Sequence, residues 1–132
     1  MSTVMTSPKD VVLGVYDAFA RGDIERLTSY LSPDIVWHES GENPLAGQHV
    51  GVGGVLGLFG SIMERTQNTF RADFVDLAVD GEIVYAYHRS RGERDGRTYD
   101  IPDILRCTVQ DGVVTEVRLF CHDQAAEDQL FA

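Results

Sequence analysis

Acidic and imidazole side chains occur at positions where the hydrophobic pattern points toward a core. Asp103 alternates in phase with Leu105 and Cys107, and His88 is in phase with Val84. A carboxylate and an imidazole in apolar surroundings can exchange a proton with a ligand, which is what general acid and base catalysis requires. The sequence therefore predicts an acid and a histidine inside a strand-rich core.

The register of one hairpin decides whether these two side chains meet. If Asp95-Gly96 is a two-residue hairpin loop, Arg94 pairs with Arg97, and the same ladder places His88 opposite Asp103. Opposed side chains on one face have Cβ atoms roughly 5 Å apart. The pair could then touch directly or hold one polar ligand atom between them.

The next hairpin needs a different loop. A two-residue loop at Asp111-Gly112 would place the two apolar sets on opposite faces, so we expect a three-residue loop there. In that register Asp103 lies opposite Cys121, and Cys107 lies opposite Val117. The two cysteines would be on the order of 13 Å apart along the strand, too far for a disulfide.

Two more acids complete the candidate catalytic set. Glu39 ends a predicted strand, and Asp123 continues the apolar side of the last strand. Enolisation at a carbonyl needs a base near the acidic carbon and a donor near the oxygen, roles open to Glu39, Asp123 and the His88–Asp103 pair. The simpler interpretation is that His88 and Asp103 only pair with each other, while Glu39 and Asp123 are solvated strand ends.

Helical periodicity comes first along the chain and strand alternation follows. We expect helices at about 8–21, 24–31 and 52–65, a turn at 32–34, a strand at 35–39, a loop at 40–51, strands at 70–77, 83–92, 97–109 and 113–122, and a short closing helix at 124–132. This order is typical of an α+β fold in which helices cover one face of a curved, mostly antiparallel sheet. We expect a single domain over 1–132, with an ordered core at about 10–131.

Charge and hydropathy limit the partners. The 132 residues carry a formal net charge of −10, so phosphate backbones and anionic lipid surfaces would repel the protein. Met1 to Lys9 lack the apolar core of a signal peptide, and the longest uncharged stretch, Val50 to Met63, is too short for a bilayer. We expect a soluble, cytoplasmic protein that binds neither nucleic acid nor membranes.

The histidines do not predict a metal centre. His38, His49 and His122 share no helix or loop at ligand spacing, so we expect no metal and no cofactor. Tyr85, Tyr87 and Phe120 would form an aromatic patch on the outer face of the sheet. We expect a homodimer to cover this patch.

Several segments resemble a known family. These are YDAFARGD at 16–23, LSPDIVWHE at 31–39, NPLAG at 43–47, DGR at 95–97 and QDG at 110–112. Together they resemble the SnoaL-like branch of the nuclear transport factor 2-like superfamily, from about residue 10 to 131. The resemblance implies a cone in which a curved sheet wraps three helices around a deep pocket, often in dimers that pack sheet against sheet.

The family's site residues fall on this chain as follows. The general base of the ketosteroid isomerases falls on Glu39, and their protonated oxyanion-hole acid falls on Asp103. Their tyrosine falls on Val15, so that donor is missing unless His88 replaces it. The acid that ends the last strand of the polyketide cyclases resembles Asp123, although the tail that follows departs from the family pattern.

The resemblance implies a cofactor-independent isomerase, cyclase or lyase acting by acid/base chemistry on a small apolar carbonyl compound, such as a polyketide intermediate. Epoxide hydrolases, a dehydratase and noncatalytic members share the fold, so a noncatalytic ligand-binding or assembly domain, and a dehydratase or hydrolase that uses a pocket water, are the alternatives. The expected substrate-binding residues are Tyr16, Trp37, Phe59, Leu105, Leu119 and Cys121.

Overall fold

The computed structural model describes residues 7–132. Residues 1–6 of the predicted domain lie outside the described part. The elements in chain order are α1 (Pro8–Arg21), α2 (Ile24–Ser29), β1 (Leu31–Glu39), β2 (Gly47–Val50), α3 (Gly51–Arg65), β3 (Arg71–Asp80), β4 (Ile83–Arg94), β5 (Arg97–Gln110), β6 (Val113–Cys121) and α4 (Gln124–Leu130).

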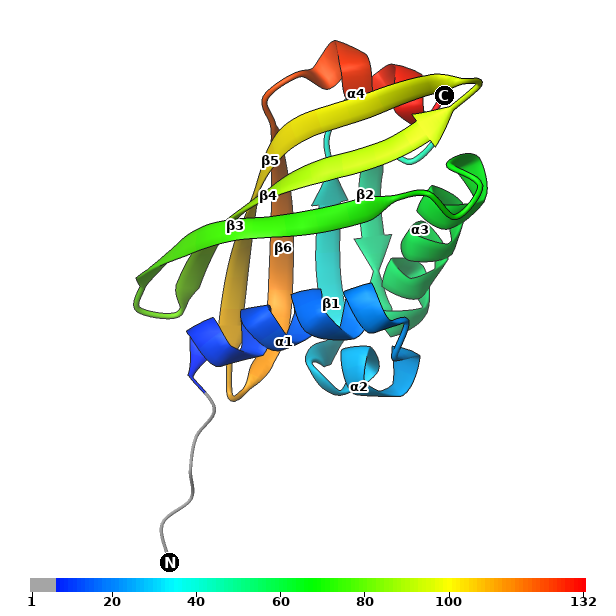
Figure 1. Cartoon of the computed structure of the whole chain (residues 1–132). Helices are drawn as coiled ribbons and strands as arrows, with labels where there is room; N and C mark the ends of the chain where they lie inside the picture. The colour runs from blue at the N-terminus through cyan, green and yellow to red at the C-terminus, as the bar shows by residue number, and fades with distance from the viewer. Residues whose placement is uncertain (1–6) are drawn as a thin grey trace, which may run out of the picture.

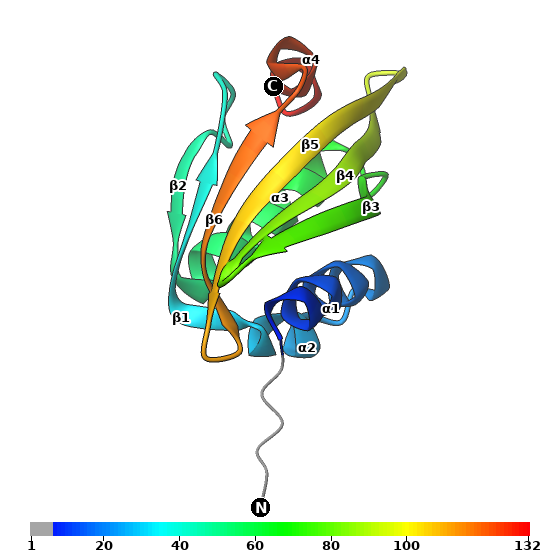
Figure 2. The same ribbon diagram turned by 90° about the vertical axis from the view of Figure 1, so that its left-hand side faces the viewer.

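One twisted six-stranded sheet organises the molecule, with the strand order β2-β1-β6-β5-β4-β3. Neighbouring strands are antiparallel except β1 and β6, which are parallel. Helices α1 and α3 lie on the same side of the sheet, α1 against β3 to β6 and α3 against β1 and β2, while α4 lies across one end (Figures 1 and 2). The predicted α+β class is confirmed.

The helix boundaries follow from local chemistry. The Ser7 hydroxyl accepts a hydrogen bond from the Asp10 backbone N–H at 3.2 Å and caps α1. Gly22, at φ 65°, ends α1 in the left-handed region that glycine adopts without strain. The Asp23 carboxylate then accepts from the Arg26 N–H and begins α2.

The central hairpin has the predicted register. Asp95 and Gly96 both have positive φ angles, 52° and 79°, and form the two-residue loop between β4 and β5. Arg94 pairs with Arg97, and the ladder continues without a shift until His88 pairs with Asp103. Both side chains are buried, so the predicted inward face of β4 is also confirmed.

The last hairpin differs from the prediction of a three-residue loop. Gln110 pairs with Val113, so the loop is the two residues Asp111-Gly112. Thr115 is then an extra residue in β6, because the pairing passes from Val114 directly to Glu116. This bulge, rather than the loop, restores the apolar phase, and the predicted pairs of Asp103 with Cys121 and of Cys107 with Val117 are both present.

The first strand and its neighbour also differ from the prediction. The predicted turn at 32–34 lies within β1, which begins at Leu31 and has an irregular register until Val36. Proline has no backbone N–H to donate to a neighbouring strand. Pro33 is tolerated there because the register is irregular and residue 33 has no paired residue in β6. The predicted loop at 40–51 contains β2, a strand of four residues that the polar sequence GQHV did not indicate.

Within residues 7–132, no helix is long and apolar enough to cross a bilayer. Both cysteines are free.

The outer face of the sheet carries an apolar row. Ile104 and Phe120 are paired neighbours and are 40% and 52% exposed, and Tyr87 pairs with Ile104 from the other side. Tyr85, 41% exposed, adds to the same face. These side chains come from three neighbouring strands, β4, β5 and β6, and form one continuous patch.

We expect a second copy of the chain to cover this outer row. Phe120→Asp should convert a homodimer to a monomer, because a carboxylate at the centre of an apolar interface would be desolvated without a partner. Light scattering coupled to size-exclusion chromatography measures the mass. Ile24→Asp, which places the same charge on exposed α2, should leave the dimer intact, and a monomeric wild-type protein would contradict the expectation.

Candidate functional site

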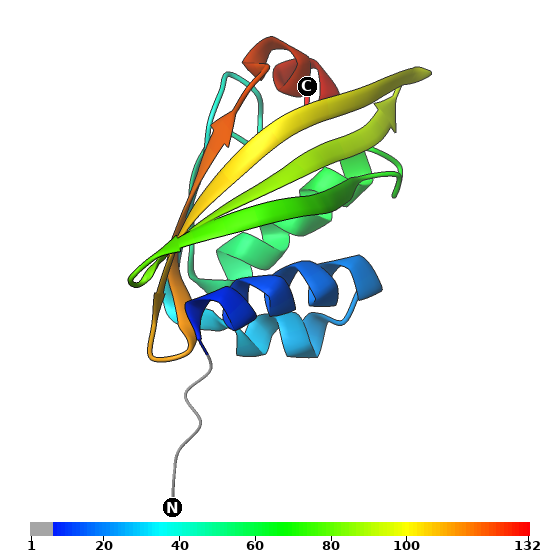
Figure 3. The same ribbon diagram turned by 60° about the vertical axis from the view of Figure 1, so that its left-hand side comes forward.

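Figure 3 shows the helices α1 and α3 on one side of the curved sheet. A cavity lies between the sheet and these two helices. Its volume is about 70 Å³. The apolar lining residues are Val15, Phe19, Trp37, Phe59, Ile62, Phe70, Ala72, Leu105, Leu119 and Phe131. The polar ones are Tyr16, Glu39, His88, Ser90, Asp103 and Glu127. We call this space the inner cavity.

Four of the polar groups form one hydrogen-bonded chain. The Tyr16 hydroxyl lies 2.6 Å from His88 Nδ1, and His88 Nε2 lies 3.1 Å from the Ser90 hydroxyl oxygen. The Ser90 hydroxyl donates to Asp103 Oδ2 at 2.6 Å. His88 Nε2 is 3.6 Å from the same carboxylate oxygen. The predicted His88–Asp103 pair is therefore connected through Ser90 rather than only by direct contact.

This chain has two consistent arrangements of its hydrogens, because each link needs one donor and one acceptor. With Asp103 ionised, Ser90 donates to it, His88 donates from Nε2, and the Tyr16 hydroxyl donates to Nδ1. With Asp103 protonated, every donor reverses, and the Tyr16 hydroxyl is free to donate into the inner cavity. The Tyr16 hydroxyl can therefore donate into the inner cavity when Asp103 holds a proton at the other end of the chain.

Tyr16 is the hydroxyl that the resemblance failed to find. The family position falls on Val15, but Tyr16 also lies in the cavity wall, and its hydroxyl reaches His88. Burial, followed by the nearby Cys107 and Asp103, raises the pKa of Tyr16 well above its usual value. The phenol therefore stays neutral and acts as a hydrogen-bond donor or acceptor.

Glu39 faces the same cavity from the end of β1. The Trp37 indole N–H donates to its Oε1 at 2.8 Å. Burial raises the pKa of Glu39 to about 7, against the opposing effect of the Trp37 hydrogen bond, and the charge of Asp103 adds to the increase. A carboxyl that titrates near neutrality suits a general base.

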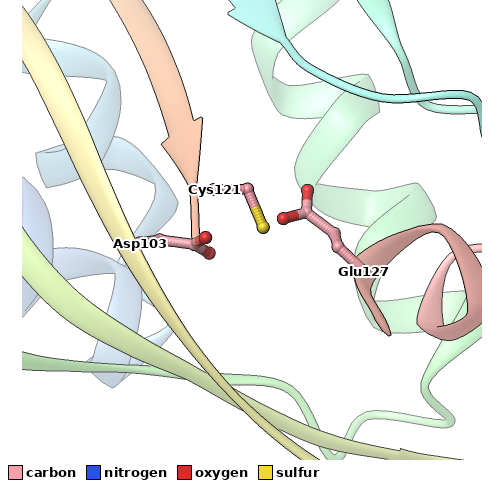
Figure 4. A group of neighbouring side chains, drawn as sticks. All are labelled: Asp103, Cys121 and Glu127. Carbon is pink, nitrogen blue, oxygen red and sulfur yellow. The ribbon is translucent and has the colours of Figure 1, made fainter. Parts of the chain in front are cut away.

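Glu127 is the third carboxyl group at the cavity. Figure 4 shows Asp103, Cys121 and Glu127 converging from β5, β6 and α4, and their ligand atoms lie within 4.8 Å of one another. Glu127 is 1% exposed and Asp103 is 3% exposed. Among the described residues, Asp103 Oδ1 and both Glu127 oxygens have no hydrogen-bond partner.

The same crowding changes how these groups titrate. Burial raises the pKa of Glu127 to about 8, with the negative charges of Asp103, Glu39 and Asp128 adding to the effect and the Cys121 thiol opposing it. Burial and the two carboxyls also raise the pKa of the Cys121 thiol. The thiol is therefore protonated at neutral pH and is not a nucleophile.

These three side chains are also the residues with which a cation could be held. The histidines weighed for a metal lie elsewhere: His38 contacts Glu116 at 3.2 Å, His49 contacts the Leu45 carbonyl at 2.7 Å, and His122 is exposed. The absence of a metal remains a prediction.

The sequence-predicted site residues are brought together except for two. Glu39, His88, Asp103, Tyr16, Trp37, Phe59, Leu105 and Leu119 all line the inner cavity. Cys121 lies outside its wall, although its sulfur is close to Asp103 and Glu127.

The prediction that Asp123 faces inward as a catalytic residue is wrong. It is exposed, and its carboxylate accepts from the Ala126 N–H at 3.1 Å as the N-cap of α4. The strand ends at Cys121, so the inward alternation extrapolated to Asp123 no longer applies.

Sequence reasoning gave Ser90 and Glu127 no role. Ser90 is two residues from His88 and so shares its face of the strand, and that alternation is the signal available in the sequence. Glu127 shares a helix face with Leu130 and Phe131, at the i, i+3 and i+4 spacing of an apolar stripe. Asp103 was identified because it is an acid among the apolar positions of a strand. Glu127 is likewise an acid among the apolar positions of a helix.

Comparisons with known proteins agree with this architecture. A family model described as a SnoaL-like domain matches residues 12–117. The uncharacterized protein Rv0034 of Mycobacterium tuberculosis (strain ATCC 25618 / H37Rv) is 31% identical over 125 residues, covering 93% of this chain and 95% of that protein.

Two solved structures extend the comparison. A protein of unknown function with a cystatin-like fold from Xanthomonas campestris is 30% identical with a TM-score of 0.91, over 96% of this chain and 99% of that one. IdmH, a putative polyketide cyclase from Streptomyces antibioticus, is 23% identical with a TM-score of 0.76, over 96% and 100% of the two chains. At that identity the likeness to IdmH shows the fold alone.

Glu127→Gln should stabilise the protein at alkaline pH. The folded pKa of Glu127 lies above its unfolded value, so the native state binds the extra proton and loses stability as pH rises toward and through 8. Glutamine removes that ionisation, and the variant should exceed the wild type by a few kcal/mol at pH 9. Urea unfolding at pH 6 and pH 9 measures the difference.

The Asp128→Asn change, at a half-buried position of the same helix, is the control, because hydrogen bonds from neighbours such as Asn43 lower the pKa of Asp128. It should not stabilise the protein at pH 9. An unfolding free energy of Glu127→Gln equal to that of the wild type at both pH values would contradict the assigned burial of an unpartnered carboxylate.

Proposed function

Because the chain belongs to the SnoaL-like domain family, we propose that it is a cofactor-independent enzyme that moves protons on a small, largely apolar carbonyl compound. Its reaction class is isomerisation, cyclisation or elimination through an enol. A polyketide intermediate is one compound of this kind. IdmH, a protein of the same fold, is described as a putative polyketide cyclase. The family alone does not select a reaction, because one fold can carry many unrelated chemistries.

The chain Tyr16–His88–Ser90–Asp103 is the observation that carries the proposal. It joins a hydroxyl at one point of the cavity wall to a buried carboxyl at another by hydrogen bonds of 2.6, 3.1 and 2.6 Å. Such a chain lets a proton that arrives at one end be replaced by a proton that leaves at the other. Glu39 stands apart from this chain and supplies a second, independent proton acceptor.

The proposed step balances without a co-reactant. The Glu39 carboxylate removes a proton from the carbon beside the carbonyl, and the electron pair of that C–H bond shifts to form the enol double bond. The carbonyl oxygen gains its proton from Tyr16, and Tyr16 is reprotonated through His88 and Ser90 as Asp103 becomes ionised. Reversal with Glu39 delivering its proton to a different carbon completes an isomerisation.

The other two reactions share this enol. Attack of the enol carbon on a second carbonyl group of the same molecule closes a ring, and expulsion of a leaving group one carbon further along gives an elimination. In each case the pocket supplies a base, a proton donor to oxygen and apolar walls that keep water from competing. The geometry of the substrate decides which path follows.

Unpartnered acids favour an enzyme over the alternative of a noncatalytic binding domain. A pure binding pocket is more stable when each buried acid is matched by a neighbour. Here Asp103 Oδ1 and both oxygens of Glu127 lack such a partner among residues 7–132. Carboxyl oxygens without a partner can accept a hydrogen bond from a ligand or take up a proton.

Exchange of carbon-bound hydrogen tests the proposal without knowledge of the natural substrate. The protein is incubated in D₂O with 2-butanone, cyclohexanone or acetophenone, and proton NMR follows loss of the signal beside the carbonyl. We expect exchange above the buffer rate for at least one ketone. Tyr16→Phe and Asp103→Asn should each reduce it by about 10²-fold or more, the usual contribution of a general acid or base.

Tyr30→Phe is the matched control, because it removes a hydroxyl that lies outside the inner cavity. Circular dichroism and thermal melting should show that all variants are folded. Exchange no faster than in buffer with every ketone, or equal rates for the wild type and the Asp103→Asn variant, would contradict the proposed role.

The exchange rate should also depend on pH through Glu39. A general base must be ionised, and the pKa of Glu39 is about 7, so the rate should rise about tenfold per pH unit as the pH approaches 7 from below. Glu39→Gln should remove both the rate and its pH dependence. A rate that does not change between pH 5.5 and 7 in the wild-type protein would exclude Glu39 as the base.

A further inference from the structure

The inner cavity is too small for most ligands of a proton-transfer enzyme. Its volume of about 70 Å³ falls well below the roughly 300–1,000 Å³ of typical ligand pockets. It can enclose a carbonyl group with a few neighbouring atoms, or a few water molecules. Any larger substrate must place the rest of its atoms elsewhere.

A second depression adjoins the inner cavity. This outer groove, of about 570 Å³, lies between the end of α1, the helix α3 and the start of β3. Leu56, Gly60 and Met63 of α3 form one side, and Arg71 and Asp73 of β3 form part of the other. Its volume is in the range of ligand pockets.

Three phenylalanine rings separate the two spaces. Phe19, Phe59 and Phe70 line both the inner cavity and the outer groove. The Phe19 ring contacts the other two edge-on, with centroids 5.2 Å from Phe59 and 6.1 Å from Phe70. Ala72 of β3 also lines both spaces, so the boundary consists of these three rings and one small residue. Rotation of the rings is the movement by which we expect the two spaces to join.

The charged residues of the outer groove are already paired. Arg21 contacts Asp17 at 3.0 Å, and Arg71 contacts Asp73 at 3.4 Å. No cation or anion in the wall is thus left to select a charged group, while phenylalanine, leucine, isoleucine and methionine side chains supply most of the remaining surface. The groove suits an uncharged, apolar chain or ring.

We propose that the inner cavity and the outer groove form one binding site for an amphipathic carbonyl compound, with the reacting carbonyl end inside and an apolar remainder across the phenylalanine partition in the groove. This inference rests on the proposed function for the identity of the carbonyl end. It adds the substrate class: ketones with a compact polar end and an apolar tail too large for the inner cavity.

Two glycines of α3 provide a matched test. A Cβ built at Gly60 or at Gly57 meets no atom within 4 Å, so both positions have open space for an added side chain. Gly60 lines the outer groove, whereas Gly57 does not. Both substitutions replace a helical glycine by leucine and raise helix propensity alike, so a difference between them reports on the groove.

The experiment titrates the wild type, Gly60→Leu and Gly57→Leu with 2-alkanones from 2-butanone to 2-decanone. Trp37, the single tryptophan, lies in the inner cavity and reports binding by fluorescence. In the wild type, affinity should rise about fourfold per methylene once the chain reaches the groove. Gly60→Leu should weaken 2-decanone binding at least tenfold and leave 2-butanone within twofold, and Gly57→Leu should match the wild type for both.

Equal binding of 2-decanone by the two leucine variants would overturn the proposal, and so would a wild-type affinity that does not increase with chain length. Failure of every 2-alkanone to bind, checked by saturation-transfer NMR, would overturn it too. The titration needs no turnover, so it is separable from the deuterium-exchange test. Length-dependent binding without exchange would leave the groove in place and refute only the acid/base proposal.

Discussion

The pairing of β4 with β5 is the constraint on which the site depends. Because the ladder runs without a shift from Arg94–Arg97 to His88–Asp103, a histidine and an aspartate meet on the buried face of the sheet. A slip of one residue would turn every side chain of a strand to the opposite face. Ser90, two positions from His88, completes the connection only in this register. The chemistry of the pocket is thus set by the geometry of one hairpin loop.

That placement has an energetic consequence for the whole domain. Asp103, Glu127 and Glu39 face one small cavity. Burial raises the pKa of Glu39 to about 7 and the pKa of Glu127 to about 8. The surrounding core of valine, leucine and isoleucine side chains stabilises the fold enough to keep these acids out of water. The site is therefore the part of the molecule where buried acids lower the stability of the fold.

How much of this could be predicted from the sequence depended on whether the signal was local. Caps, glycine turns and strand alternation are local, and they predicted α1, α2, the β4–β5 register and the inward direction of His88 and Asp103. The bulge at Thr115, the short strand β2 and the extended start of β1 depend on partners distant in the sequence. Asp123 was misplaced because strand alternation was carried past Cys121, where β6 ends. Glu127 lies in the predicted closing helix, and it belongs to the site because the fold brings it close to Asp103, which is distant in the sequence.

The parallel pairing of β1 with β6 has a consequence for synthesis. β1 is made early but lies between β2 and β6, so one of its edges stays unpaired until residue 118 has been polymerised. Glu127 follows later still, on the final helix. On the ribosome, the nascent chain therefore holds an open sheet edge while residues 40–118 are made, and an unpaired edge of this kind makes a partly folded chain prone to aggregation.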